Sequence, residues 1–197
     1  MGPHNALRAA ERLLACGVDG LANWGVAGAL DESLAPGDIV VPECIRHAPD
    51  DPGFATDAAT CDRIVAACSA TLPVRRGALW SSSAPVTSRA DKRALAERSG
   101  AIAVDMEAAA VAAVAARAGL PFVAVKAICD PLGRELPRRI MRALDSGGGP
   151  SWRMLSAIAF GGPPVWSAAR KLARDFSEAR RALTSAARLA ALAAVAA

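Results

Sequence analysis

The stretch Ala101–Pro131, AIAVDMEAAAVAAVAARAGLPFVAVKAICDP, decides the fold of this chain. Ile102–Val104 is short and apolar, as in a strand, and Met106–Ala118 is rich in alanine, as in a helix that ends at Gly119. Phe122–Cys129 is apolar again and predicts a second, buried strand. Strand, helix and strand in succession predict a right-handed parallel crossover.

Two carboxylates stand where this unit would bring them together. Glu107 lies in the first turn of the predicted helix, and Asp130 directly follows the second strand. If the two strands are parallel, both end at one sheet edge, where ligands of open α/β sheets bind. Each residue has a local alternative: Glu107 suits the positive end of a helix, and Asp130 suits a turn. The pair together favours a shared crevice.

The segments before this unit alternate between the same two patterns. The predicted helices are 4–16, 57–71 and 88–98, and the predicted strands are 19–24, 38–45 and 74–81. Strands that alternate with helices are typical of an α/β fold in which a sheet lies between helix layers. At 197 residues the chain can bury a substantial core as one globular domain.

Two motifs resemble those of a known superfamily. VDMEAAAVA, followed by a strand and then Asp130, is similar to the ribose and base motifs of the purine nucleoside phosphorylases and methylthioadenosine/S-adenosylhomocysteine nucleosidases. NWGVAGALDESLAPGDIVVPE, residues 23–43, resembles their glycine-containing loop and the strand after it. The part from Leu132 onward more specifically resembles the hopanoid-associated phosphorylases, which are thought to remove adenine from adenosylhopane.

This resemblance implies a fold and a reaction. The fold is a three-layer α/β/α sandwich with a mixed central sheet, and the reaction cleaves the N-glycosidic bond of a purine nucleoside by hydrolysis or phosphorolysis. Asp130 would donate a proton to purine N7 or hydrogen-bond with it. Glu107 would accept hydrogen bonds from the ribose hydroxyls, and Met106 would pack on the ribose face. No cofactor is implied.

The resemblance also implies a base pocket at Pro85, Val86 and Cys129. The segment Ser81–Thr87, SSSAPVT, matches the position where the family often has an aromatic residue stacked on the purine. Pro85 stands there instead, so stacking should be weaker. The serines of this segment are alternatively an ordinary polar loop.

A loop that holds the nucleophile is the next implied feature, and its candidate residues are Gly2, Gly25, Val26 and Ala27. In the phosphorylases this loop carries an Arg and a Ser or Thr that grip phosphate, and this chain has Asn23 and Val26 at the matching positions. Water and phosphate therefore both stay open as nucleophiles. The GVAG sequence lacks the GxGxxG spacing of a dinucleotide site.

The N-terminal sequence MGPHNA resembles the middle of the family's turn into its first helix. We therefore expect an N-terminally truncated fold that lacks the first strands. In the nucleosidases a missing strand ends in the Glu that activates the attacking water, and positioned acids and bases typically contribute ~10²–10⁴-fold. The alternative function is accordingly a truncated, catalytically weak nucleoside-binding protein of the same fold.

Other chemistries lack their residues. His4 and His47 are the only histidines, no serine lies in a GxSxG elbow, and the five cysteines contain no CxxC pair. We therefore expect no metal site, and we expect His47 to be a surface loop residue. The N-terminus has no apolar secretory core, which favours a cytoplasmic protein, soluble or peripheral at the inner membrane.

The positive charge of the chain belongs to its C-terminal part. Residues 150–197 hold seven Lys or Arg against two carboxylates, so we divide the chain into an α/β domain, 1–149, and a basic amphipathic helical extension, 150–197. A short helix after Trp152 and a longer one are separated by GGPP at 161–164. The apolar stripe of the longer helix is Leu172, Phe176, Ala179, Leu183, Ala187 and Ala190.

This extension has two interpretations. One is a helix packed on its own domain or on a twin subunit, which agrees with an expected homo-oligomer. The other is contact with an anionic membrane, where a nucleoside-lipid substrate would reside. Nucleic acid is not expected, because the basic segment has little aromatic interleaving.

Overall fold

The computed structural model of the chain describes residues 2–49, 52–133 and 162–195. Its helices are α1 (Pro3–Ala15), α2 (Ala58–Cys68), α3 (Arg89–Ser99), α4 (Ala108–Ala118) and α7 (Gly162–Val195). Its strands are β1 (Leu21–Ala29), β2 (Ile39–Arg46), β3 (Phe54–Ala55), β4 (Val74–Ser81), β5 (Ala101–Asp105) and β6 (Phe122–Asp130).

The predicted succession of helices and strands is confirmed, except that the two-residue strand β3 was not predicted. β4 has the predicted ends, most other ends differ by one or two residues, and α2 ends at Cys68 rather than at residue 71. Two differences affect the site. β1 continues to Ala29, so Gly25, Val26 and Ala27 lie in a strand and not in a loop, because β6 pairs with β1 from Leu21 to Gly28. Helix α4 begins at Ala108 and not at Met106, because the carboxylate of Asp105 accepts a hydrogen bond from the Ala108 backbone N–H.

The sheet is mixed, as expected, with the order β3-β2-β4-β5-β1-β6. β2, β4 and β5 run parallel to one another, and β1 runs parallel to β6. The two groups meet in antiparallel pairs, β1 with β5 and β2 with β6. Because Ile39 and Val40 pair with Ala127 and Lys126, the strands β2, β4, β5, β1 and β6 form a closed ring.

The predicted parallel crossover from β5 to β6 is wrong. β1 lies between these strands, parallel to β6 and antiparallel to β5, so β5 and β6 run in opposite directions. Their carboxyl ends nevertheless meet, because β1 and β5 pair only at Gly28 with Val104 and at Ala29 with Ala103. Gly28 also pairs with Asp130. The expected crevice therefore forms where the ends of the antiparallel strands β1 and β5 meet the end of β6.

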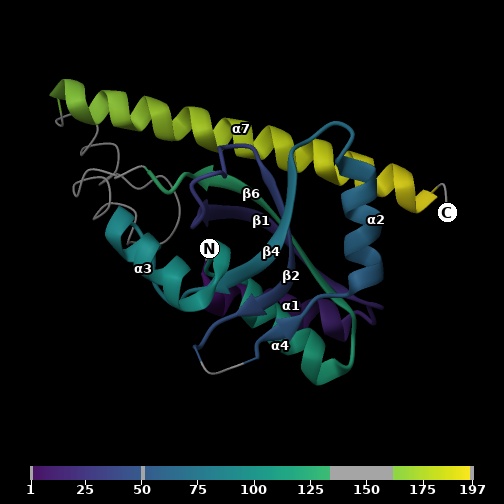
Figure 1. Cartoon of the computed structure of the whole chain (residues 1–197). Coiled ribbons are helices and arrows are strands. Elements are labelled where there is room, and N and C mark those ends of the chain that lie inside the picture. The colour runs from purple at the N-terminus through teal and green to yellow at the C-terminus, as the bar shows by residue number, and fades with distance from the viewer. Residues whose placement is uncertain (1, 50–51, 134–161, 196–197) are drawn as a thin grey trace.

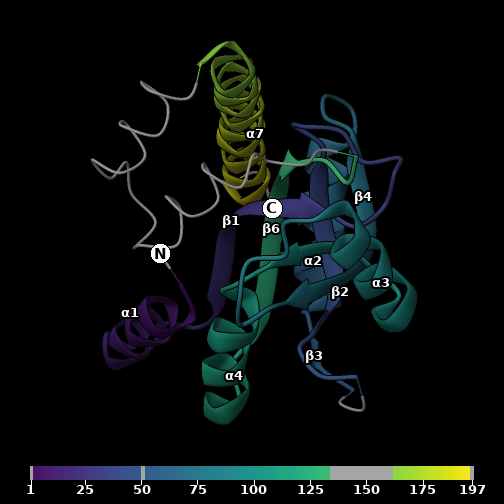
Figure 2. The same cartoon turned by 90° about the vertical axis from the view of Figure 1, so that its left-hand side faces the viewer.

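Helices cover both faces of the sheet (Figures 1 and 2). One face carries α1 and α4, whose Ala10, Val111 and Val114 share a core with Leu21 and Ile128. The other face carries α2 and α7. A third cluster around Trp80 and Leu95 holds α3 beside β5. This arrangement agrees with the expected layers of helix, sheet and helix.

Helix α7 packs on its own domain, but along a stripe that only partly matches the predicted one. Ala179, Ala182 and Ala186 are buried in the core formed with α2 and β6, and only Ala179 of these belongs to the predicted stripe, whose Ala187 is exposed. Trp24 Nε1 donates a hydrogen bond to the Leu183 carbonyl over 3.4 Å. Phe176 of the predicted stripe is 50% exposed. Pro163 and Pro164 fall in the first turn of α7, where a missing N–H costs no helical hydrogen bond.

The short helix expected after Trp152 and the boundary at 149/150 lie outside the described residues. Within the described ranges, no helix is both long and apolar enough to cross a membrane. The expected homo-oligomer stays a prediction.

Candidate active site

A cavity of about 330 Å³ opens where β1, β5 and β6 end. It contains most of the residues that the sequence suggested for a nucleoside site. These are Val26, Ala27, Pro85, Val86, Met106, Glu107, Cys129 and Asp130. The other described residues of its wall are Gly28, Ala84, Thr87, Val104, Asp105 and Leu172.

Two candidates for the nucleophile loop lie outside this wall. Gly2 precedes the first turn of α1, and Gly25 lies on β1 opposite Lys126. A Cβ at Gly25 would stand 3.5 Å from Lys126 Nζ, so the strand passes close to that ammonium group. The structure therefore brings the ribose and base candidates together and separates Gly2 and Gly25 from them.

Asp130 is held at the end of β6 by a buried lysine. Lys92 of α3 is 0% exposed, and its Nζ lies 2.6 Å from Asp130 Oδ2. Asp130 Oδ1 is also buried, and no hydrogen-bond partner for it exists in the part of the chain that the structure describes. One oxygen of this carboxylate is thus fixed, and the other is left for a ligand.

Asp105 forms a second lysine-held carboxylate in the same wall. Its Oδ2 lies 2.7 Å from Lys126 Nζ, with the two side chains 0% and 2% exposed, and it accepts a 2.9 Å hydrogen bond from the Ala108 N–H. Asp105 Oδ1 is buried and has no hydrogen-bond partner among the residues described. Buried ion pairs need such extra hydrogen bonds to offset their desolvation.

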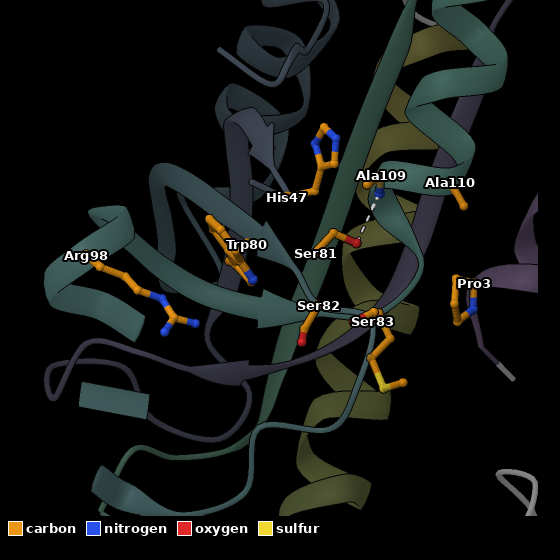
Figure 3. A pocket seen from close by; sticks show the side chains of 10 residues that line it. Pro3, His47, Trp80, Ser81, Ser82, Ser83, Arg98, Ala109 and Ala110 are labelled. Carbon is orange, nitrogen blue, oxygen red and sulfur yellow. Dashed lines mark hydrogen bonds between the residues drawn. The ribbon is translucent and has the colours of Figure 1, made fainter. Parts of the chain in front are cut away.

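Glu107 and Met106 occupy the turn between β5 and α4. Both are half-buried and line the cavity. The turn is fixed from the side by Ser81, whose Oγ accepts a hydrogen bond from the Ala109 N–H over 3.1 Å. Figure 3 shows this contact and the residues around it. The backbone that carries the two ribose candidates is therefore anchored at both ends of the turn.

A second cavity, of about 370 Å³, shares Met106 with the first, and Figure 3 shows the residues that line it. Ser81, Ser82 and Ser83 line it, together with His47, Trp80 and Arg98. The three serines therefore line a cavity next to the candidate nucleoside site, and Ser82 and Ser83 also form part of a polar loop. His47 is exposed, as expected, and stacks on Phe54 with ring centres 5.4 Å apart. The described residues contain no cluster of groups suited to a metal ion.

Cys129 is not a nucleophile in this cavity. Burial raises the pKa of its thiol to about 11, and the adjacent negative charge of Asp130 acts in the same direction. The thiolate is the reactive form of cysteine, so a thiol with this pKa stays neutral and unreactive near pH 7. Cys129 therefore contributes to the shape and polarity of the wall.

The described wall has three carboxylates, at Asp105, Glu107 and Asp130, and no Lys, Arg or His. Lys92 and Lys126 stand behind the wall, each committed to one carboxylate. From the sequence, Lys126 was predicted only to interrupt an apolar run. A lysine in the middle of FVAVKAIC indicates a buried lysine that needs a carboxylate partner, whereas Lys92 cannot be recognised in this way because the sequence of α3 is highly charged.

The sequence matches the family model described as the phosphorylase superfamily over residues 1–144. The chain belongs to this superfamily. A comparison with curated proteins found no match. Solved structures with low sequence identity to this chain have a similar fold.

Two 5'-methylthioadenosine/S-adenosylhomocysteine nucleosidases illustrate the similarity. The enzyme from Neisseria meningitidis, in complex with methylthio-immucillin-A, has a TM-score of 0.71 and 19% identity, over 97% of this chain and 77% of that one. The enzyme from Helicobacter pylori, with butyl-thio-DADMe-Immucillin-A, has a TM-score of 0.68 and 20% identity, over 100% and 77%. Futalosine hydrolase from Helicobacter pylori has a TM-score of 0.65 and 19% identity, over 95% and 76%. At these identities the similarity establishes the fold.

Proposed function

We propose that this protein cleaves the N-glycosidic bond of a purine nucleoside and releases adenine, with water as the nucleophile. The observation that carries the proposal is Asp130 Oδ1, a buried carboxylate oxygen without a partner among the described residues, in a cavity that also contains Glu107. The superfamily membership and the nucleoside analogues named with the two nucleosidases support the same reaction.

The chemistry assigns a role to each side of the cavity. The C1'–N9 bond breaks with both electrons going to the base, and the carboxyl group of Asp130 donates its proton to N7, so the base leaves neutral. The proton that the attacking water releases restores the carboxyl group. Glu107 accepts hydrogen bonds from the ribose hydroxyls, and Met106 packs against the sugar. The oxygen of a water then bonds to C1'. In the products the base has gained one proton and the water has lost one.

The charge of the wall favours water over phosphate. Lys126 and Lys92 already balance Asp105 and Asp130, so a phosphate dianion would meet the charge of Glu107, and the described wall offers it no cationic side chain. Like charges in a shielded site repel strongly because the effective dielectric constant is low. Asn23 and Val26, at the positions where phosphorylases of the family hold phosphate, supply no cation either.

The test is a reaction in phosphate-free buffer. We expect adenosine or 5'-methylthioadenosine to yield adenine and the free sugar at a rate that added phosphate does not raise. Chromatography of adenine and of the sugar product measures both. A requirement for phosphate, with sugar 1-phosphate as the product, would contradict hydrolysis while retaining glycosidic cleavage.

A nucleoside-binding protein with weak catalysis is the second candidate. The observation in its favour is that Gly2 and Gly25, two candidates for the nucleophile loop, do not line the cavity. Calorimetry with 5'-methylthioadenosine separates the candidates: binding without adenine release over a long incubation would favour the binding protein.

Glu107→Gln should weaken the sugar side of the site. The amide keeps the size of the side chain but loses the charge that strengthens a hydrogen bond to a hydroxyl, and such bonds contribute roughly 1.5–3 kcal/mol. We expect the affinity for the nucleoside and the turnover each to fall about 10–100-fold, because a tenfold change corresponds to about 1.4 kcal/mol. Calorimetry with free adenine is the control, and its affinity should not change. An equal loss for adenine and nucleoside would make Glu107 a structural residue.

The substrate that we propose in finer detail is a nucleoside with a large apolar 5' substituent, as in adenosylhopane. Most of the wall is apolar, and Leu172 of α7 contributes to it, so the C-terminal helix takes part in the site.

The outer side of α7 carries Arg170, Arg181 and Arg188, all exposed, opposite the buried alanines. We propose that this side meets an anionic membrane, with the protein peripheral at the inner membrane.

Binding of the full chain to vesicles tests the membrane contact. Each Lys or Arg near an anionic surface contributes ~1 kcal/mol, screened within about 8 Å at physiological salt. We expect co-sedimentation with anionic vesicles at low salt, less as salt rises, and little with neutral vesicles. Replacing Arg170, Arg181 and Arg188 by Gln should abolish it, while Arg8→Gln with Arg12→Gln on α1 serves as the control. Equal sedimentation of both variants would make the charge of α7 irrelevant to membranes.

A further inference from the structure

We propose that Lys92 is a positioning residue that orients Asp130 toward the leaving base. The inference rests on the proposed function and adds to it a residue on α3 that does not itself line the cavity. Its basis is the set of acceptors to which the Lys92 ammonium group donates hydrogen bonds.

All three donors of the Lys92 ammonium go to two consecutive residues. Nζ lies 2.6 Å from Asp130 Oδ2, 3.4 Å from the Asp130 carbonyl oxygen and 3.2 Å from the Pro131 carbonyl oxygen. An ammonium group has three N–H donors, so this set uses its full capacity. Lys92 therefore holds both the side chain and the backbone of Asp130, and it leaves only Oδ1 for a ligand.

The backbone of Gly28 also lies close to the carboxylate. A Cβ placed on Gly28 would lie 3.3 Å from Val104 Cγ1 and 3.7 Å from Asp130 Oδ2. Oδ2 of Asp130 thus lies against both the ammonium group and a strand position without a side chain. Two such contacts define one orientation, which is what a group that must meet a fixed base atom requires.

The segment that carries Lys92 also forms the base side of the wall. Pro85, Val86 and Thr87 line the cavity, and α3 begins immediately after them with Ser88 as its cap. Ser88 Oγ accepts a 3.0 Å hydrogen bond from the Asp91 N–H, next to Lys92. The base pocket and the residue that orients Asp130 are therefore neighbours on one short segment.

Stability alone does not account for this lysine. Burying an ammonium group costs several kcal/mol, and replacement of a buried ion pair by apolar residues is often neutral or stabilising. The pair also leaves Asp130 Oδ1 without a partner in the described structure, which a purely structural pair would not need. Orientation of the free oxygen explains both features.

A double-mutant cycle tests the inference, with Lys92→Met, Asp130→Asn and the combined variant. We expect Lys92→Met to slow adenine release about 10–100-fold, the range expected for a misplaced catalytic group. In the Asp130→Asn background the same change should have almost no further effect, because Lys92 acts through Asp130. Losses that multiply in the combined variant would overturn the inference.

The split between kcat and KM gives a readout that a merely structural role would not move. Lys92 does not line the cavity, so Lys92→Met should lower kcat by a larger factor than it raises the KM for the nucleoside. Lys92→Gln, which keeps a donor without the charge, should show a smaller loss of kcat and serves if Lys92→Met does not fold. Leu95→Ala, which loosens α3 from its core, is the control, and its kcat should stay unchanged. An unchanged kcat in both Lys92 variants contradicts the inference.

Calorimetric binding of free adenine separates this inference from the proposed function, because it needs no turnover. If the wild-type chain releases no adenine but Lys92→Met weakens adenine binding about tenfold, the proposed reaction fails and the orienting role remains. If the wild type is active and Lys92→Met matches it in kcat, KM and adenine affinity, the orienting role fails alone.

Discussion

Asp130→Asn should reduce the rate of adenine release by ~10²-fold or more, the loss expected when a positioned acid-base group is removed. The amide has the size of the carboxyl group and can still accept a hydrogen bond from Lys92, so the end of β6 should keep its structure. What it loses is the proton-donating oxygen that we place against purine N7, because an amide cannot transfer a proton to the base. Rates of adenine release at saturating nucleoside measure the effect.

The control for this variant is its fold. The circular dichroism spectrum of Asp130→Asn should match that of the parent chain, while its urea midpoint should fall, because the buried Lys92 ammonium group loses its charge partner. Asp91→Asn, an exposed carboxylate on α3, is a matched substitution outside the cavity and should leave the rate unchanged. A folded Asp130→Asn protein with near-parental turnover would remove Asp130 from the mechanism.

Lys126→Met should lower the free energy of unfolding by ~3–5 kcal/mol, the range measured when one partner of a buried ion pair is removed. The loss is large because the Asp105 side chain is 0% exposed, so no solvent replaces the lost ammonium partner. Methionine is close to lysine in length and fits the same channel beside Gly25. Urea unfolding followed by circular dichroism measures the change.

The combined variant Lys126→Met with Asp105→Asn should regain much of this stability, because it no longer buries a lone charge. Lys171→Met, at an exposed position of α7, is the matched surface control and should change the free energy of unfolding by less than ~0.5 kcal/mol. If Lys126→Met unfolds at the parental urea concentration, the pair with Asp105 contributes nothing net to the fold.

Local pattern in the sequence was enough to place the helices and strands. The apolar run Phe122–Cys129 and the alanine-rich run before it became β6 and α4, and Val74–Ser81 became β4 without a change of boundary. These segments could be predicted because burial of one face imposes a period on the residues that form it. The meeting of Glu107 with Asp130 was also anticipated.

The predicted parallel crossover was wrong, because the direction of a strand depends on partners far away in the sequence. The strand that separates β5 from β6 is β1, which pairs with both of them, over 76 residues at Gly28 with Val104 and over 101 residues at Leu21 with Phe122. The lysine pairs were hidden for a related reason. Lys92 is one of several charged residues on α3, and only the three-dimensional structure shows that it alone turns inward to Asp130.

The closed ring of strands has a consequence for synthesis of the chain. β6 is the last strand of the ring, yet it pairs with β1 and β2, which are made first. Until residue 130 has left the ribosome, the Leu21–Gly28 edge of β1 has no partner along most of its length. Exposed apolar edges of this kind pair with other chains and promote aggregation. Nascent chains that stop before β6 should therefore depend on chaperones far more than the finished protein does.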